Sequence, residues 1–191
     1  MQLTDLNTPQ RTVRFDRERL TLEDINAIAR GTAKPALSDD PAFRAAIAKG
    51  ADFLDRLLRE DGTIYGVTTG YGDSCTVEVP LSLVRDLPHH LYTYHGCGLG
   101  AYLDPGQTRA VMAARLASLS KGFSGVSVGL LEQIVRLFDA GLLPLVPSEG
   151  SVGASGDLTP LSYLAAVLCG ERGVLRDGVQ VAAGQALQGA G

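Results

Sequence analysis

The sequence has no surplus of basic residues. Its 17 Lys and Arg residues are outnumbered by 21 Asp and Glu residues, and the formal net charge is −4 at pH 7. Binding to nucleic acid or to an anionic membrane depends on clustered Lys and Arg. The composition therefore favours a small-molecule or protein ligand over nucleic acid or a membrane surface.

Cysteine is also scarce, with three residues at positions 75, 97 and 169 and no C-x-x-C pair. This sparse, odd set argues against a disulfide framework and against a zinc site, so we expect no metal. We interpret Cys75 and Cys97 as small packing residues. Residues 1–5 show no apolar signal core, and no apolar run approaches the roughly 18 residues of a membrane-spanning helix. We therefore expect a cytoplasmic protein.

Helical patterns dominate the chain. With 191 residues, 45% of them hydrophobic, the chain can bury one sizeable core or two small ones. Residues 128–140 give the clearest amphipathic helix, with an apolar face of Leu130, Leu131, Ile134, Leu137 and Phe138. Thr21 with Asp24 resembles a capping box, and Asp-Pro pairs at 40–41 and 104–105 are typical helix starts.

The segments that predict β-strands are short. Residues 12–15 alternate as a strand does, and residues 174–181 predict a hairpin that turns at Asp177-Gly178. Residues 80–94 read as helical, with Pro88 as a kink or break. The tail, residues 182–191, shows no visible cap. The sequence thus predicts a mainly α fold with small β elements, and helical bundles often bury their sites between facing helices.

Residues 148–163 form a glycine-rich turn that leads to a helix start. Asp157 or Thr159 is a candidate cap for that helix, and Pro160 suits its first turn. A helix start favours an anion or a developing negative charge. The glycines run G-x-x-G-x-x-G, which matches neither a dinucleotide fingerprint nor a phosphate loop, and Ser155 does not lie in G-x-S-x-G. We expect no nucleotide cofactor; the plainest alternative is a loop before a capped helix.

The same stretch resembles a known signature. Residues 150–161, Gly-Ser-Val-Gly-Ala-Ser-Gly-Asp-Leu-Thr-Pro-Leu, are similar to the motif of the histidine, phenylalanine and tyrosine ammonia-lyases. In that family an Ala-Ser-Gly tripeptide cyclises and dehydrates to 4-methylidene-imidazol-5-one (MIO). The resemblance implies that Ala154, Ser155 and Gly156 form MIO here. The Gly156 nitrogen would attack the Ala154 carbonyl and Ser155 would lose water, which requires a tight turn with small neighbours.

A second glycine-rich stretch covers residues 64–72, Ile-Tyr-Gly-Val-Thr-Thr-Gly-Tyr-Gly. From the residues alone, Tyr65 could be a half-buried aromatic at a strand end. The stretch resembles the family loop Tyr-Gly-x-Asn-Thr-Gly-Phe-Gly, which implies that Tyr65 is the catalytic base for the β-proton. An ordinary phenol is a weak base at neutral pH, so this role requires nearby positive charge or helix dipoles. Thr68 and Tyr71 depart from the family's Asn and Phe.

A third stretch, residues 91–100, resembles the family segment that contacts the substrate's ring. Tyr94-His95 aligns with Ser-His of histidine-type members and His-Leu of many tyrosine-type members. The resemblance implies that His95 hydrogen-bonds an imidazole or a phenol, beside Tyr94, which is bulkier than Ser. The alternative for His95 is a satisfied histidine at a helix end. We interpret His89 and His90 as solvated or supporting residues.

Taken together, the resemblance implies the helical-bundle ammonia-lyase fold. Residues 1–191 would be the amino-terminal, MIO-bearing portion of a longer lyase chain, whose remaining site residues lie downstream and whose family members form homotetramers. The implied reaction removes ammonia from an aromatic or heteroaromatic L-amino acid and leaves an α,β-unsaturated acid. Histidine is the first choice of substrate because of His95, and tyrosine is a close second.

Three other functions remain open at this point. A 2,3-aminomutase of the same family would return ammonia to the β-carbon and release a β-amino acid. A non-catalytic helical interaction protein would keep an unmodified tripeptide. A nucleotide-binding module would be stabilised by nucleotide, and the glycine spacing disfavours it.

Overall fold

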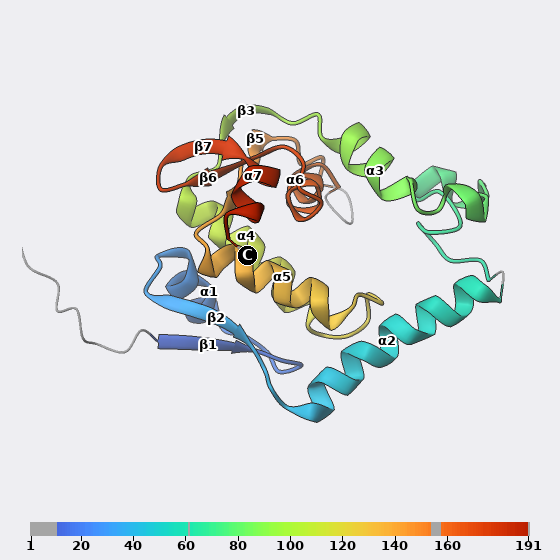
Figure 1. The fold of residues 1–191 in the computed structure, drawn as a ribbon, viewed down its shortest axis with the longest axis horizontal. Coiled ribbons are helices and arrows are strands. Elements are labelled where there is room, and N and C mark those ends of the chain that lie inside the picture. The colour runs from blue at the N-terminus through green and yellow to red at the C-terminus, as the bar shows by residue number, and fades with distance from the viewer. Residues whose placement is uncertain (1–10, 61, 154–157, 191) are drawn as a thin grey trace, which may run out of the picture.

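The computed structural model describes residues 11–60, 62–153 and 158–190. Within them, the helices are α1 (Leu22–Ala29), α2 (Pro41–Arg59), α3 (Leu87–His95), α4 (Pro105–Leu119), α5 (Val128–Asp139), α6 (Leu158–Leu168) and α7 (Ala183–Gln188). The strands are β1 (Arg11–Phe15), β2 (Ala33–Leu37), β3 (Leu99–Tyr102), β4 (Leu143–Pro144), β5 (Pro147–Glu149), β6 (Gly173–Arg176) and β7 (Val179–Ala182). Short 3₁₀ turns cover Gly72–Thr76 and Leu81–Leu83. The mainly α class with small β elements is confirmed (Figure 1).

The helix starts follow the cap signals in the sequence. The Thr21 side chain accepts the Asp24 N–H while the Asp24 carboxylate accepts the Thr21 N–H, which completes the predicted capping box of α1. Asp104 and Gln107 form a second reciprocal box at α4. Asp40 accepts the Ala42 N–H at the start of α2. Local side chains therefore satisfy amide groups that each first turn leaves unpaired.

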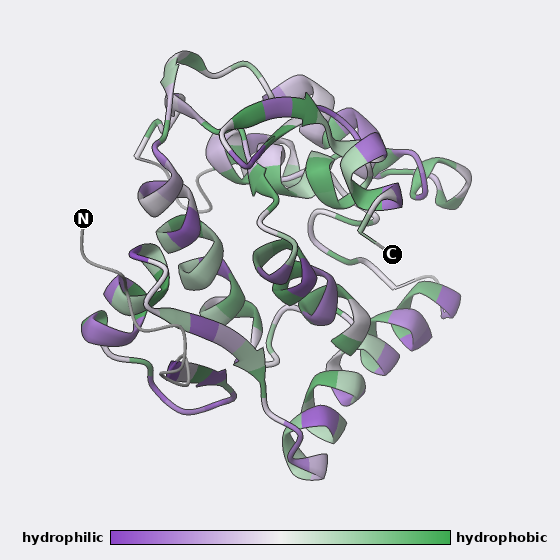
Figure 2. Cartoon of the chain, turned by 60° about the vertical axis from the view of Figure 1, so that its left-hand side comes forward, coloured by the Kyte–Doolittle hydropathy of each residue, from purple (hydrophilic) through white to green (hydrophobic). Residues whose placement is uncertain are grey.

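The core has two connected parts around α4 and α5. The first part packs α1, β1, β2 and α2 against these helices, and its largest fully buried side chains include Phe15, Ile28, Ile47, Leu116 and Leu131. The second part packs α6, α7 and the strands β4 and β6 around Met112, Leu137, Leu142, Val167 and Val174. Phe138 and Leu168 contact both parts and join them. In Figure 2 the helices α2 and α5 carry hydrophilic residues on one side and hydrophobic residues on the other.

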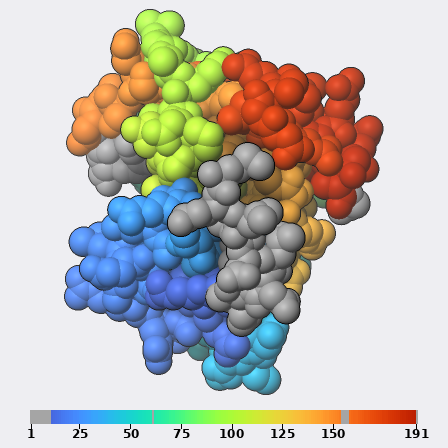
Figure 3. Space-filling model, turned by 90° about the vertical axis from the view of Figure 1, so that its left-hand side faces the viewer, coloured from blue at the N-terminus to red at the C-terminus, as the bar shows by residue number. Residues whose placement is uncertain are grey.

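Three small sheets complete the fold. The strands β1 and β2 pair in parallel across α1, and β4, β6 and β7 form an antiparallel sheet in that order. The predicted hairpin turn is confirmed, because Asp177 and Gly178 both have positive φ, at 51° and 79°. The third sheet pairs β3 with β5 and brings residues near 100 beside residues near 150 (Figure 3, green and orange).

Some local predictions were wrong. Of the two alternatives for Pro88, the kink is wrong: residues 80–94 are broken into a 3₁₀ turn and the separate helix α3, and Pro88 lies in the first turn of α3, where its missing N–H costs nothing. No helix was predicted for residues 182–191, where the structure has α7; this helix has no side-chain cap, and its buried Ala183 and Ala186 pack into the second core.

The structure places all three cysteines as free thiols. Cys75 and Cys97 are exposed, so the interpretation of these two as packing residues was wrong. No helix in the part of the chain that the structure describes has the length and apolar character needed to cross a membrane.

Candidate active site

Tyr65 lies in a loop over residues 62–79, which we call the Tyr65 loop. The Thr68 hydroxyl accepts the Ile64 N–H at 2.8 Å and donates to the Gly62 carbonyl at 3.1 Å. Thr69 is only 3% exposed and forms an isolated antiparallel bridge with Glu78. Thr68, where the family carries Asn, therefore closes the loop with two hydrogen bonds of its own.

Tyr65 itself is 66% exposed. Its hydroxyl accepts the N–H of Gly72 at 2.8 Å, so the phenol oxygen faces the far side of the same loop. Tyr65 also lines a cavity of about 640 Å³ together with Arg17, Lys49 and Lys121. Basic side chains and the Tyr65 phenol thus line the same cavity.

His95 is the last residue of α3 and meets two tyrosines. The Tyr71 hydroxyl forms a short hydrogen bond with Nε2 of His95, and the two ring centroids lie 5.4 Å apart. The Tyr94 ring meets the His95 ring edge-on at 5.1 Å and is itself 78% exposed. Burial, with a smaller effect of Tyr94, raises the pKa of Tyr71 above its ordinary value.

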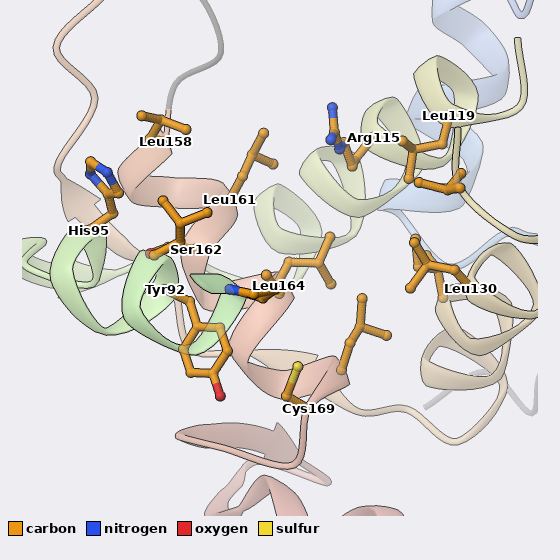
Figure 4. Close-up of a pocket in the computed structure, with 16 residues that line it drawn as sticks. Tyr92, His95, Arg115, Leu119, Leu130, Leu158, Leu161, Ser162, Leu164 and Cys169 are labelled. Atoms are coloured by element: carbon orange, nitrogen blue, oxygen red, sulfur yellow. The ribbon is translucent and has the colours of Figure 1, made fainter. Parts of the chain in front are cut away.

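A largely apolar cavity of about 430 Å³ lies between α3, α4, α5 and α6. His95 and Leu158, the first residue of α6, both line it, and Figure 4 shows them at the same end. Arg115 of α4 also lines it, and burial lowers the pKa of this guanidinium. The cavity has the character of a pocket for an apolar or aromatic group with a few polar contacts.

The carboxyl end of α3 is fixed to α6 by Arg172 and Tyr163. The Arg172 guanidinium donates to the carbonyls of Tyr92 and Gly96, at 3.3 and 3.1 Å. The same group lies over the Tyr163 ring, and the Tyr163 hydroxyl accepts the Gly98 N–H at 3.1 Å. The end of the helix that carries His95 is therefore held against α6.

The tripeptide Ala154-Ser155-Gly156 and the candidate cap Asp157 lie outside the described residues. The residues on either side of them approach closely: a Cβ added to Gly150 would lie 2.7 Å from Cγ2 of Thr159. The predicted helix does begin here, at Leu158, and Thr159 lies inside it, so Thr159 is not its cap. Gly150 and Thr159, on either side of the residues that the structure leaves undescribed, therefore lie close together.

The structure connects two of the three predicted sites. The consecutive residues Tyr71 and Gly72 bond to His95 and Tyr65 respectively, so the Tyr65 loop reaches the end of α3. Tyr65 and His95 nevertheless line different cavities. Sequence reasoning missed the roles of Arg172 and Tyr163, for which no local pattern gave a signal. Tyr71 did stand out in the sequence, because the family loop carries Phe at this position.

Comparisons with known proteins agree with this architecture. The family model "Aromatic amino acid lyase" matches residues 20–191. A histidine ammonia-lyase of Bos taurus is 39% identical over 85% of this chain, which covers 24% of that protein. An MIO-dependent tyrosine 2,3-aminomutase of Streptomyces globisporus is 39% identical over 98% of this chain, which covers 34% of that protein.

Solved structures show the same fold. Ergothionase from Treponema denticola superposes with a TM-score of 0.87 at 26% identity, over 94% of this chain and 35% of that one. Tyrosine aminomutase from Streptomyces globisporus gives 0.84 at 34% identity, over 93% of this chain and 33% of that one. The helical fold is therefore that of the ammonia-lyases and aminomutases. The chain belongs to the aromatic amino acid lyase family, and it spans about a quarter to a third of the length of these relatives.

Proposed function

We propose that residues 1–191 are the amino-terminal, MIO-bearing portion of an ammonia-lyase that acts on an aromatic or heteroaromatic L-amino acid. The observation that supports this best is the Ala154-Ser155-Gly156 tripeptide, which lies just before α6 in sequence and is flanked by the close approach of Gly150 to Thr159. When formed, MIO supplies an electrophile that activates the amino group as a leaving group. The first turn of α6, with its partial positive charge, favours electron density placed next to it.

Tyr65 is the proposed base that takes the β-proton. Tyr65 lines a cavity together with Arg17, Lys49 and Lys121. The Gly72 N–H donates to the hydroxyl oxygen of Tyr65 and holds it in place. Loss of the β-proton and of ammonia leaves the α,β-unsaturated acid.

Tyr94 and His95 are the proposed contacts to the substrate's side chain. An imidazole nitrogen of His95 can hydrogen-bond the ring of histidine or the hydroxyl of tyrosine. Histidine remains the first choice of substrate and tyrosine a close second. The apolar walls of the cavity beside His95 suit an aromatic ring in either case.

The active enzyme is proposed to be the complete chain as a homotetramer in the cytoplasm. Because this chain spans only a quarter to a third of its relatives, residues beyond it would complete each site. No group of three or more potential metal ligands occurs among the described residues, and the proposed chemistry uses neither a metal nor a nucleotide.

The test is to offer the complete protein L-histidine, L-tyrosine and L-phenylalanine separately. Ammonia release with appearance of the unsaturated acid supports the lyase. The amino acid that is turned over identifies the side chain that His95 contacts. The Streptomyces globisporus relative favours one second candidate, a 2,3-aminomutase, which would release the β-amino acid instead.

A non-catalytic protein built on the same helical fold would turn over none of these substrates. Mass analysis of the peptide that contains residues 148–163 then decides. A mass lower by two waters supports MIO formation, whereas an unmodified peptide would remove the lyase and the aminomutase together.

A further inference from the structure

Tyr71 is the residue of the Tyr65 loop that reaches the imidazole of His95. Its hydroxyl hydrogen-bonds Nε2 of His95, and the rings are tilted by 54° with centroids 5.4 Å apart. In the part of the chain that the structure describes, no other hydrogen bond to the His95 side chain is present. One hydroxyl therefore fixes which way this imidazole faces.

The backbone around Tyr71 is held on both sides. The Gly70 N–H donates to the Val77 carbonyl at 2.9 Å, and the Tyr71 carbonyl accepts the Ser74 N–H at 3.1 Å. The next N–H, of Gly72, donates to the Tyr65 hydroxyl. The Tyr71 ring thus projects from a fixed turn, and its hydroxyl has little freedom to leave His95.

A hydrogen bond at Nε2 has a chemical consequence for the other ring nitrogen. In a neutral imidazole one nitrogen donates and the other accepts, so the partner at one site determines the role of the other. Burial and the neighbouring Tyr94 raise the pKa of Tyr71, which keeps its hydroxyl protonated and able to donate at neutral pH. When the Tyr71 hydroxyl donates to Nε2, a neutral imidazole carries its proton on Nδ1, which is then a donor; this tautomer is the one proposed for His95.

We propose that Tyr71 is a positioning residue that determines substrate specificity, because it holds the His95 imidazole with Nε2 engaged and Nδ1 free to donate to the substrate's ring. A donor at this position selects aromatic amino acids whose ring carries a hydrogen-bond acceptor, namely the imidazole of histidine or the hydroxyl of tyrosine. This inference rests on the proposed function, in which His95 contacts the substrate's side chain.

The test is a double-mutant cycle in the complete protein, with Tyr71→Phe, His95→Leu and the double variant. Phe keeps the ring and removes only the hydroxyl, so the turn and the Gly72–Tyr65 hydrogen bond are expected to persist. We expect Tyr71→Phe to lower kcat/KM about tenfold on the preferred polar-ring substrate, the size of one hydrogen bond. In the His95→Leu background the same change should cost less than twofold.

Tyr102→Phe is the matched control, because it removes the hydroxyl of a tyrosine that is 49% exposed on β3 and lines neither cavity. It should leave kcat/KM within twofold. If Tyr71→Phe costs the same factor with and without His95, or costs less than twofold in the wild-type background, Tyr71 does not act through His95 and the proposal is overturned.

A second measurement separates this inference from the proposed function. If the complete wild-type protein turns over no aromatic amino acid, the proposed function fails, yet the state of His95 can still be measured. Nitrogen NMR of histidine-labelled complete protein, with the His95 signal assigned from His95→Leu, should show the Nδ1-protonated tautomer. Tyr71→Phe should shift that signal; an unchanged tautomer in Tyr71→Phe would exclude the positioning role.

Discussion

The guanidinium of Arg172 lies over the ring of Tyr163, with 4.5 Å between Cζ and the ring centroid. Arg172 precedes β6 and has a positive φ of 63°, a conformation that a non-glycine residue rarely adopts. From this position it reaches the carbonyls of Tyr92 and Gly96 at the end of α3. The placement of His95 relative to α6 therefore depends on contacts from a residue more than seventy positions away in sequence.

Gly96→Ala should disturb this contact. The added Cβ would overlap the Arg172 guanidinium and lie 2.7 Å from the Tyr92 carbonyl oxygen, so α3 must shift at its carboxyl end. We expect a loss of about 1–3 kcal/mol in the free energy of unfolding, typical of overpacking, together with a lower kcat/KM. Thermal unfolding and steady-state kinetics of the complete protein measure both.

Gly129→Ala is the matched control for that change. Gly129 lies in α5, and the nearest atom to an added Cβ is the Ser127 hydroxyl oxygen at 3.7 Å. Alanine should raise stability there by about 0.5–1 kcal/mol, because it favours the helix. Equal effects of the two substitutions would contradict the steric argument at Gly96.

Ser155→Ala should abolish turnover in the complete protein, because alanine has no hydroxyl to lose as water and no methylidene can form. The measurements are ammonia release and the mass of the tryptic peptide. Ser151→Ala, in the same loop, removes a hydroxyl that accepts the Gly153 N–H at 3.3 Å and should retain both activity and the dehydrated mass. Retained activity in Ser155→Ala would eliminate the MIO proposal.

Tyr65→Phe should lower kcat by roughly 10²–10⁴, the range for loss of a general base. The dehydrated peptide mass should be unchanged, because MIO formation does not use this phenol. Tyr65→Phe also removes the hydroxyl that accepts the Gly72 N–H, which could loosen the Tyr65 loop. Thr68→Val is the control, because it removes two other hydrogen bonds of the same loop and leaves Tyr65 in place. Its kcat measures the effect of loosening the loop alone. A loss in Tyr65→Phe no larger than in Thr68→Val would exclude the base role.

We expect α1 to become less stable at acid pH, because Asp24 becomes protonated. The Thr21 N–H, the Thr21 hydroxyl and Arg11 hold the pKa of this carboxyl below its ordinary value, against the opposing effect of burial. The ionised carboxylate is thus favoured by folding, so its contribution is present above about pH 4 and is lost as the pH falls below that. Hydrogen exchange of α1 amides should accelerate more steeply between about pH 5 and 3 in wild type than in Asp24→Asn, after correction for intrinsic rates. An equal pH dependence of exchange in the two proteins would show that ionisation of Asp24 does not stabilise α1.

Much of the helical fold was predictable because its signals are local. Thr21, Asp40 and Asp104 each satisfy the first turn of their own helix, and the Asp177-Gly178 turn needs only its two residues. The short helix α7 was missed because it has no cap side chain and is stabilised by burial of Ala183 and Ala186 against distant elements. Pro88 was misread because proline breaks a helix interior but suits a first turn, and only the start of α3 distinguishes the two.

The candidate site likewise combines features that are local in sequence, which could be predicted, with contacts between distant residues, which could not. The tripeptide motif and the Tyr-Gly loop are contiguous in sequence and were recognisable as such. The link from Tyr71 to His95 crosses 24 positions, and the stack of Arg172 on Tyr163 joins a loop to a helix. Such contacts arise from the packing of whole elements, so no spacing rule in one sequence could indicate them.

The approach of Gly150 to Thr159 bears on how the prosthetic group would arise. Folding holds Gly150 and Thr159, on either side of the tripeptide, close together, so part of the entropy of bringing the ends of this segment together is lost on folding. Under the proposed function, cyclisation is an intramolecular reaction of the tripeptide, and its rate would be independent of protein concentration. Refolded protein should acquire the modification at the same pace whether dilute or concentrated, and only once this part of the chain has folded.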